Sequence, residues 1–217
     1  MNQVAPATNQ VDTALDRPVA WVRLGGAGVL LLTGLGVLQH LAWPVLGIAV
    51  LVGSRWPGKD LRSSIAPMLV MLVAAGGLVA SALRWSTFDL AAITGAQGVL
   101  GPALLVGPGE AAAATALGMT SVLLALALAL PPDLEWDRRG WALWAAELLG
   151  IGAALALLSW GPGGAMGEMW LAAVTLAVLT GSIGWALSRA PALVAHVSLG
   201  AAGLCAGVGA LMSQIRA

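Results

Sequence analysis

The chain has 217 residues, of which 59% are hydrophobic and 9% are charged, and its mean hydropathy is +0.90. A soluble domain carries about 25% charged residues, so this composition excludes a water-facing globular fold. Lysine plus arginine equals aspartate plus glutamate at 10 each, which leaves no basic excess for nucleic acid. We therefore expect an all-α integral membrane protein, a polytopic helix bundle in the bacterial cytoplasmic (inner) membrane.

Residues 1–17 predict a polar N-terminal tail that lacks the basic n-region of a signal peptide. We expect this tail to be retained, so that the first apolar helix carries the targeting information. Residues 18–217 predict a single transmembrane bundle, because their apolar runs are Leu/Ala-rich and too long for strands. The predicted spans are about 18–38, 41–55, 65–83, 111–130, 141–159, 169–187 and 192–212.

Two segments leave the number of spans open. The uncharged stretch from Leu24 to Ser54 exceeds the roughly 20 residues that one helix needs to cross a bilayer, yet it is short for two. It is read either as one span or as a tight hairpin. Residues 90–109 are apolar but rich in glycine and proline. Either they cross the membrane, or 84–110 forms an interfacial or re-entrant segment.

Charge counting favours a hairpin at 24–54 and no crossing at 90–109. Positively charged residues in short loops favour the cytoplasmic side. This combination puts eight of the ten cations on one face: Arg17, Arg23, Arg55, Lys59, Arg62, Arg138, Arg139 and Arg189. It predicts about seven spans with the N-terminus inside and the C-terminus outside, and six or eight spans remain alternatives.

Glu147 is the most informative single residue, because it lies six positions beyond Trp141 inside an apolar helix. A carboxylate about 9 Å along such a helix is costly and faces the bundle interior or a water-filled cavity. One interpretation is a group that handles protons or cations. The other is a carboxylate near the inner interface that reaches an arginine or hydroxyl partner. Glu168 and Glu110 lie at predicted helix ends, where solvated caps explain them.

The only histidines are His40 and His196, which the seven-span topology puts on opposite faces. Either could singly ligate a haem or a chlorophyll-type magnesium through its imidazole, and small neighbours favour His196. The chain has no Cys/His cluster with metal-ligand spacing, and it carries no catalytic signature, so we predict neither a metal site nor an enzyme. No cofactor is required by the sequence.

Small residues predict the faces through which the helices associate, because close packing drives association in lipid. Gly76 with Ala80 stripes the third span, and Gly203 with Gly207 forms a GxxxG pattern in the last. Cys205 lies within that pattern and is expected to pack. Other membrane subunits and lipids are therefore the expected partners.

The stretch from Arg138 to Leu187 resembles the chain-4L-type subunit of respiratory complex I and its longer relative, component E of membrane-bound hydrogenases. The resemblance rests on the arginine pair 138–139, on Glu147 within a helix followed by Gly150 and Gly152, and on Glu168 opening the next helix. Leu148 stands where that family commonly has asparagine. The resemblance implies a proton-translocation path through Glu147, beside large antiporter-like subunits.

We therefore expect a non-catalytic, multi-pass subunit of a larger energy-transducing membrane complex, which could be respiratory, photosynthetic or ion-translocating. One alternative is a haem- or chlorophyll-binding membrane protein that uses His196. Another is a small stand-alone transporter, although internal repeats and paired broken helices are not evident in the sequence.

Overall fold

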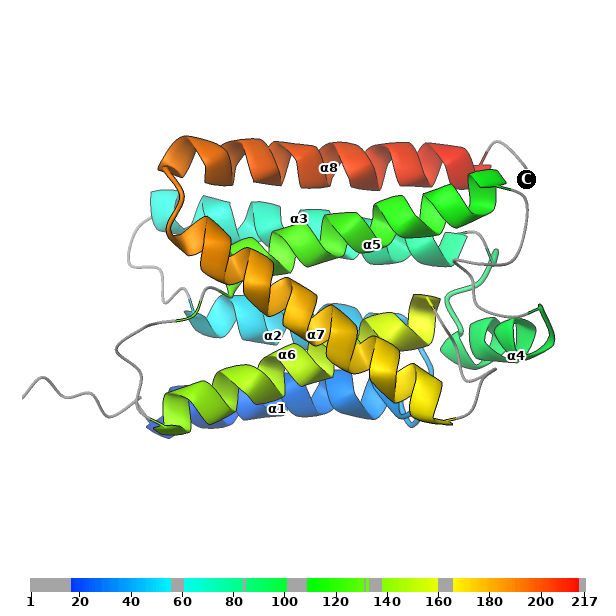
Figure 1. The fold of residues 1–217 in the computed structure, drawn as a ribbon, viewed down its shortest axis with the longest axis horizontal. Helices are drawn as coiled ribbons and strands as arrows, with labels where there is room; N and C mark the ends of the chain where they lie inside the picture. The colour runs from blue at the N-terminus through cyan, green and yellow to red at the C-terminus, as the bar shows by residue number, and fades with distance from the viewer. Residues whose placement is uncertain are drawn as a thin grey trace, which may run out of the picture.

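The computed structural model describes residues 17–55, 61–83, 85–100, 109–130, 132, 138–159 and 166–214. Within these ranges the chain is all-helical, with no named strand (Figure 1). The elements are α1 (Arg17–Gly34), α2 (Ala42–Arg55), α3 (Leu61–Leu83), α4 (Leu90–Leu100), α5 (Gly109–Ala129), α6 (Arg138–Ser159), α7 (Met166–Ser188) and α8 (Ala192–Gln214). Apart from α4, the helices start and stop within about one turn of the predicted spans.

Five helices are long and apolar enough to cross a membrane, which makes this a membrane-embedded helical protein. They are the long parts of α3, α5, α6, α7 and α8, and α1 and α2 are shorter apolar helices. All seven lie side by side and alternate in direction along the chain (Figure 1). We call the end where α1, α3, α6 and α8 begin the basic end, because Arg55, Arg138 and Arg189 lie there.

The stretch 24–54 folds as a helix-turn-helix. The α1 helix ends at Gly34, short of residue 38, because Gly36 adopts a positive φ of 72°. The amide of Gly36 donates to the Thr33 carbonyl at 2.9 Å, and that of Val37 donates to the Leu32 carbonyl at 2.9 Å. The turn satisfies the last carbonyls of α1 and sends α2 back along it.

The short helix α4 lies at the end of the bundle opposite the basic end (Figure 1). Its N-terminus is fastened to the α1–α2 turn, because Leu90 N donates to Gln39 O at 2.8 Å and Leu41 N donates to Phe88 O at 2.9 Å. The helix has 11 residues, about 16 Å, which is too short to cross a bilayer. Residues 101–108, on which the choice between an interfacial and a re-entrant segment depends, lie outside the described residues.

Small residues bring α3 and α5 into close contact. A Cβ added at Gly77 would lie 2.6 Å from the Gly118 carbonyl oxygen, and one added at Gly118 would lie 2.6 Å from the Gly77 carbonyl oxygen. The Ser81 hydroxyl donates to the Gly77 carbonyl at 2.9 Å, so it adds no unsatisfied donor to this contact. Backbones that approach so closely gain the dispersion contacts that hold helices together in lipid.

Candidate functional site

The most unusual feature of the described interior is an ion cluster around Glu147. The Glu147 side chain is completely buried on α6, and its two oxygens accept from arginines on two other helices. Arg23 on α1 donates from Nε to Oε1 at 2.5 Å and from Nη2 to Oε2 at 3.0 Å. Arg55, the last residue of α2, donates from Nη2 to Oε2 at 2.5 Å. We call these three side chains the Arg–Glu–Arg cluster.

The α1–α2 hairpin places the two arginines at the same level. The antiparallel helices are in register, since a Cβ added at Gly47 would lie 2.7 Å from Leu30 Cγ, and one at Gly26 would lie 3.0 Å from Leu51 Cδ2. One helical turn closer to the basic end, the same register places Arg23 opposite the last turn of α2, which contains Arg55. Both guanidinium groups therefore reach the same carboxylate.

The α6 helix delivers the carboxylate because it runs parallel to α1 and in contact with it (Figure 1). A Cβ added at Gly150, one turn beyond Glu147, would lie 2.7 Å from the Ala27 carbonyl oxygen, and Ala27 is one turn beyond Arg23. Only glycine permits this approach. The contact at Gly150 therefore fixes the height at which Glu147 faces Arg23.

The cluster is buried among apolar neighbours, where an isolated charge is very costly. Leu148 and Ile151 next to Glu147 on α6 are buried, and the Arg23 side chain is only 6% exposed. Charge-assisted hydrogen bonds from Arg23 and Arg55 offset the cost of burying the Glu147 carboxylate. As observed, the cluster fastens three helices to one another, which is the geometry expected if Glu147 reaches arginine partners.

The two histidines are exposed, and neither belongs to the cluster. His40 is in the α1–α2 turn, where its Nδ1 accepts from the Ala42 amide at 3.1 Å. His196 is in the first turns of α8, at the basic end, with Nδ1 2.7 Å from the Ala192 carbonyl oxygen. Among the described residues, no group of three or more His, Cys, Asp or Glu could hold a metal ion.

The remaining candidates lie on separate parts of the bundle. Glu168 is exposed in the first turn of α7, at the end opposite the basic end, and the Glu110 side chain lies outside the described residues.

Gly76 and Ala80 are on α3, where a Cβ added at Gly76 would lie 3.7 Å from Ala206 Cβ on α8. Gly203 faces Val73 on α3, whereas nothing lies within 4 Å of a Cβ added at Gly207.

Sequence reasoning did not single out Arg23 and Arg55 as partners of Glu147. In the sequence both have the positions of cations that flank a membrane span, which bear on topology alone. One signal was available: Arg23 lies six residues inside α1, deeper than a flanking cation requires, and a carboxylate inside an apolar helix needs a cation.

Comparison with known proteins adds no constraint on this site. No family model matches the chain, and no curated protein or solved structure is significantly similar to it. Its function has to be inferred from its own geometry and charge.

Proposed function

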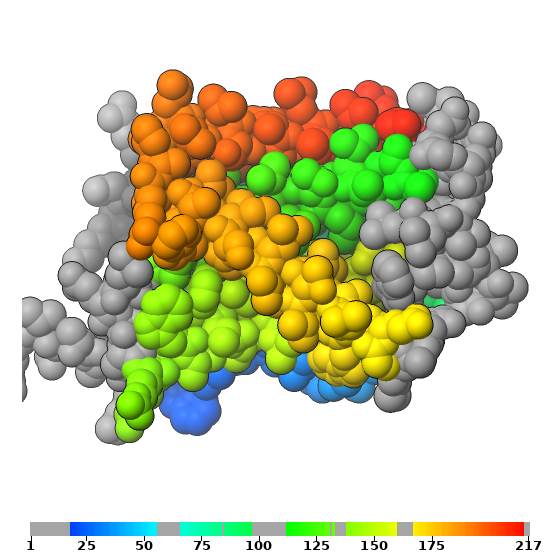
Figure 2. Space-filling model, viewed as in Figure 1, coloured from blue at the N-terminus to red at the C-terminus, as the bar shows by residue number. Residues whose placement is uncertain are grey.

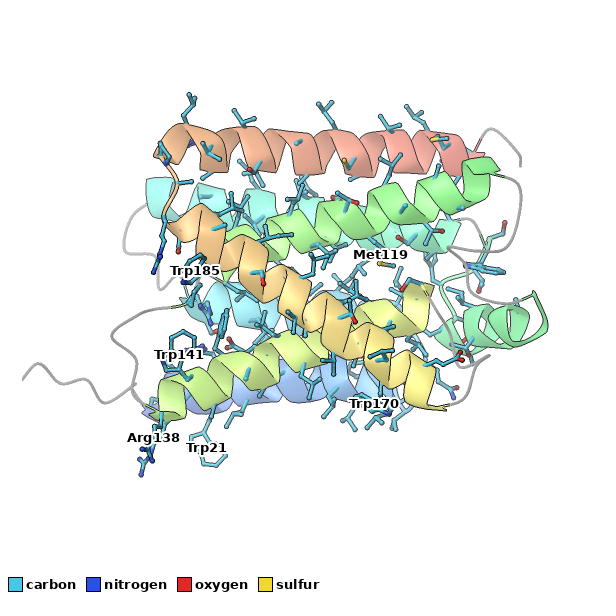
Figure 3. The ribbon with its side chains drawn as sticks, viewed as in Figure 1. Trp21, Met119, Arg138, Trp141, Trp170 and Trp185 are labelled. Atoms are coloured by element: carbon cyan, nitrogen blue, oxygen red, sulfur yellow. The ribbon has the colours of Figure 1, made fainter. Side chains whose placement is uncertain are left out.

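We propose that this chain is a non-catalytic, seven-span subunit of a larger energy-transducing complex in a bacterial cytoplasmic membrane, with its N-terminus inside. The alternating helix directions and the position of α4 at one end support seven crossings. The arginines at the basic end support a cytoplasmic location for that end. Tryptophans, which gather at membrane interfaces, also fit: Trp21, Trp141 and Trp185 lie near the basic end and Trp170 near the other (Figure 3).

The observation that carries the subunit role is the uncovered flank formed by α7 and α8. Only 28% of Gly167–Ser188 and 17% of Ala192–Gln214 are buried, against 72% of Arg138–Ser159. On α8 a Cβ added at Gly200 or Gly207 would meet nothing within 4 Å, so the backbone itself is accessible there. A face of this kind lets another transmembrane helix approach closely. We infer that partner helices pack on the α8 side of this flank.

In this role the Arg–Glu–Arg cluster braces the half of the bundle that contains α1, α2 and α6, while α8 remains available to partners. A complex I-like subunit is the narrower form of the proposal, in which Glu147 also exchanges protons. In that form the proton has to reach a carboxylate whose two oxygens already accept hydrogen bonds from the arginines.

The test is affinity purification of the tagged chain from its own membranes in mild detergent, followed by mass spectrometry. We expect defined membrane subunits to co-elute, and Gly207→Leu to deplete them by filling the open face of α8. Gly25→Leu is the matched control, because Gly25 is an exposed glycine on α1 that also has nothing within 4 Å. A colourless chain that elutes alone contradicts the subunit role and favours a small transporter.

One observation favours pigment binding as a second function. The Nδ1 atom of His196 lies at hydrogen-bond distance from the Ala192 carbonyl, which is the arrangement that orients a metal-ligating imidazole and leaves Nε2 as the ligand. A haem or chlorophyll-type macrocycle would then lie on the outer face of α8. An absorption spectrum of the isolated chain tests this: a Soret or chlorophyll band should disappear in His196→Ala and persist in His40→Ala.

A further inference from the structure

An open groove separates α6 from α7 toward the basic end. The two helices touch near Gly152, where an added Cβ would lie 3.1 Å from the Ala177 backbone nitrogen, and α7 then runs obliquely away from α6 (Figure 1). In space-filling form α7 makes an oblique ridge with the surface of α6 beside it (Figure 2). The groove between them has a volume of about 760 Å³ and an almost wholly apolar lining, which includes Trp144, Leu148, Val174, Val178 and Trp185.

The basic end of this groove carries cations and tryptophans together. The Arg189 guanidinium carbon lies 3.9 Å above the Trp185 ring, which forms part of the groove wall. On the α6 side, Trp144 Nε1 donates to the Leu130 carbonyl at 3.0 Å. The rings of Trp141 and Trp144 pack edge to face. Figure 3 shows Arg138 beyond Trp141 at this same end. An apolar slot therefore leads to a tryptophan-lined rim with positive charge.

We infer that this groove holds an acyl chain of an anionic phospholipid, with the lipid phosphate beside Arg189. The apolar lining suits an acyl chain, the tryptophans lie at the level where rings meet headgroups, and the arginines complement the negative charge. A purely apolar transmembrane helix would fill the slot but would bring no negative charge to match the cations. This inference depends on membrane embedding and not on the subunit role, so either can fail without the other.

The first test measures lipid selectivity. The delipidated full-length chain is titrated in mild detergent with phosphatidylglycerol or with phosphatidylcholine of the same acyl chains, and bound lipids are counted by native mass spectrometry. We expect phosphatidylglycerol to bind more tightly, and Arg189→Gln to lower its affinity about fivefold while leaving phosphatidylcholine unchanged. Arg189→Lys keeps the charge and should retain most of the preference. Equal affinities for the two lipids in the unaltered chain would overturn the inference.

The second test blocks the groove itself. Ala145 is exposed and lines the groove, so Ala145→Trp should reduce binding of both lipids. Ala201→Trp, at an exposed position on α8, is the control and should bind lipid normally. A folded Ala145→Trp chain with unaltered phosphatidylglycerol binding would contradict the inference. A photoreactive residue at position 178 should crosslink to phospholipid in native membranes, and crosslinking to a protein instead would identify the groove as a helix-docking site.

Discussion

Arg23 and Glu147 lie 124 residues apart in the sequence and meet in a two-point ion pair, with Nε donating to Oε1 at 2.5 Å and Nη2 to Oε2 at 3.0 Å. No local turn can produce this pair, because it joins two parallel helices, α1 and α6, between which α2 to α5 lie in the chain. The pair exists only when α1 and α6 pack in one register. It therefore reports directly on whether the bundle is correctly assembled.

Removing the carboxylate alone should destabilise the bundle strongly. Glu147→Leu leaves the Arg23 and Arg55 guanidinium groups without their buried counter-charge, and we expect a loss of about 3 to 5 kcal/mol in the free energy of unfolding. Reversible unfolding by dodecyl sulfate in mixed micelles measures it. The triple variant Arg23→Met, Arg55→Met, Glu147→Leu removes all three charges and should recover most of the loss. A triple variant as unstable as the single one would show that the charges themselves stabilise the fold.

The two arginines should differ in their tolerance of lysine. Arg23 uses two nitrogens on both carboxylate oxygens, whereas Arg55 contacts Glu147 through one nitrogen. An ammonium group cannot reproduce a two-point contact. We expect Arg23→Lys to cost about 1.5 to 3 kcal/mol more than Arg55→Lys, the contribution of one hydrogen bond to a charged group. The same unfolding assay measures both, and equal losses would contradict this asymmetry.

The contact at Gly150 should be intolerant of even one methyl group. The Cβ of Gly150→Ala would lie 2.7 Å from the Ala27 carbonyl oxygen, a backbone atom that cannot move away without shifting α1. We expect destabilisation of about 1 to 3 kcal/mol. Gly207→Ala is the control, because its Cβ enters open space and alanine favours helix by up to about 1 kcal/mol. Similar losses for the two variants would rule out the tight α1–α6 contact.

The seven-span topology predicts which residues face each side of the membrane. Gln39 lies in the turn after α1, and Arg139 lies at the start of α6, at the other end of the bundle. Each is replaced by cysteine, singly, in a chain whose own cysteine is removed by Cys205→Ala. A membrane-impermeant maleimide should label position 39 in intact cells, and position 139 only after the cells are opened. Labelling of both positions from the same side would contradict the three crossings by α2, α3 and α5 that the topology puts between them.

Helix positions were predictable because, in lipid, each helix satisfies its own backbone hydrogen bonds, so an apolar run decides its structure locally. The α1–α2 hairpin was predictable from charge counting. The start of α4 was not, because it is defined by a backbone hydrogen bond to Gln39 in the α1–α2 turn. The sequence left open whether Glu147 meets an arginine or a hydroxyl. Which arginines reach it depends on the parallel packing of α1 and α6, a tertiary property that no segment encodes alone.

The parallel pairing of α1 with α6 has a consequence for biosynthesis. Arg23 leaves the ribosome 124 residues before Glu147, a delay of about 6 to 25 s at ordinary rates of translation. During that interval the first hairpin enters the bilayer with two arginines whose counter-charge has not yet been made. Because unpaired arginines are costly in lipid, we expect such a nascent hairpin to stay near the headgroups or the insertion machinery until α6 arrives. The emergence of α6 would then set the moment at which the N-terminal half settles to its final depth.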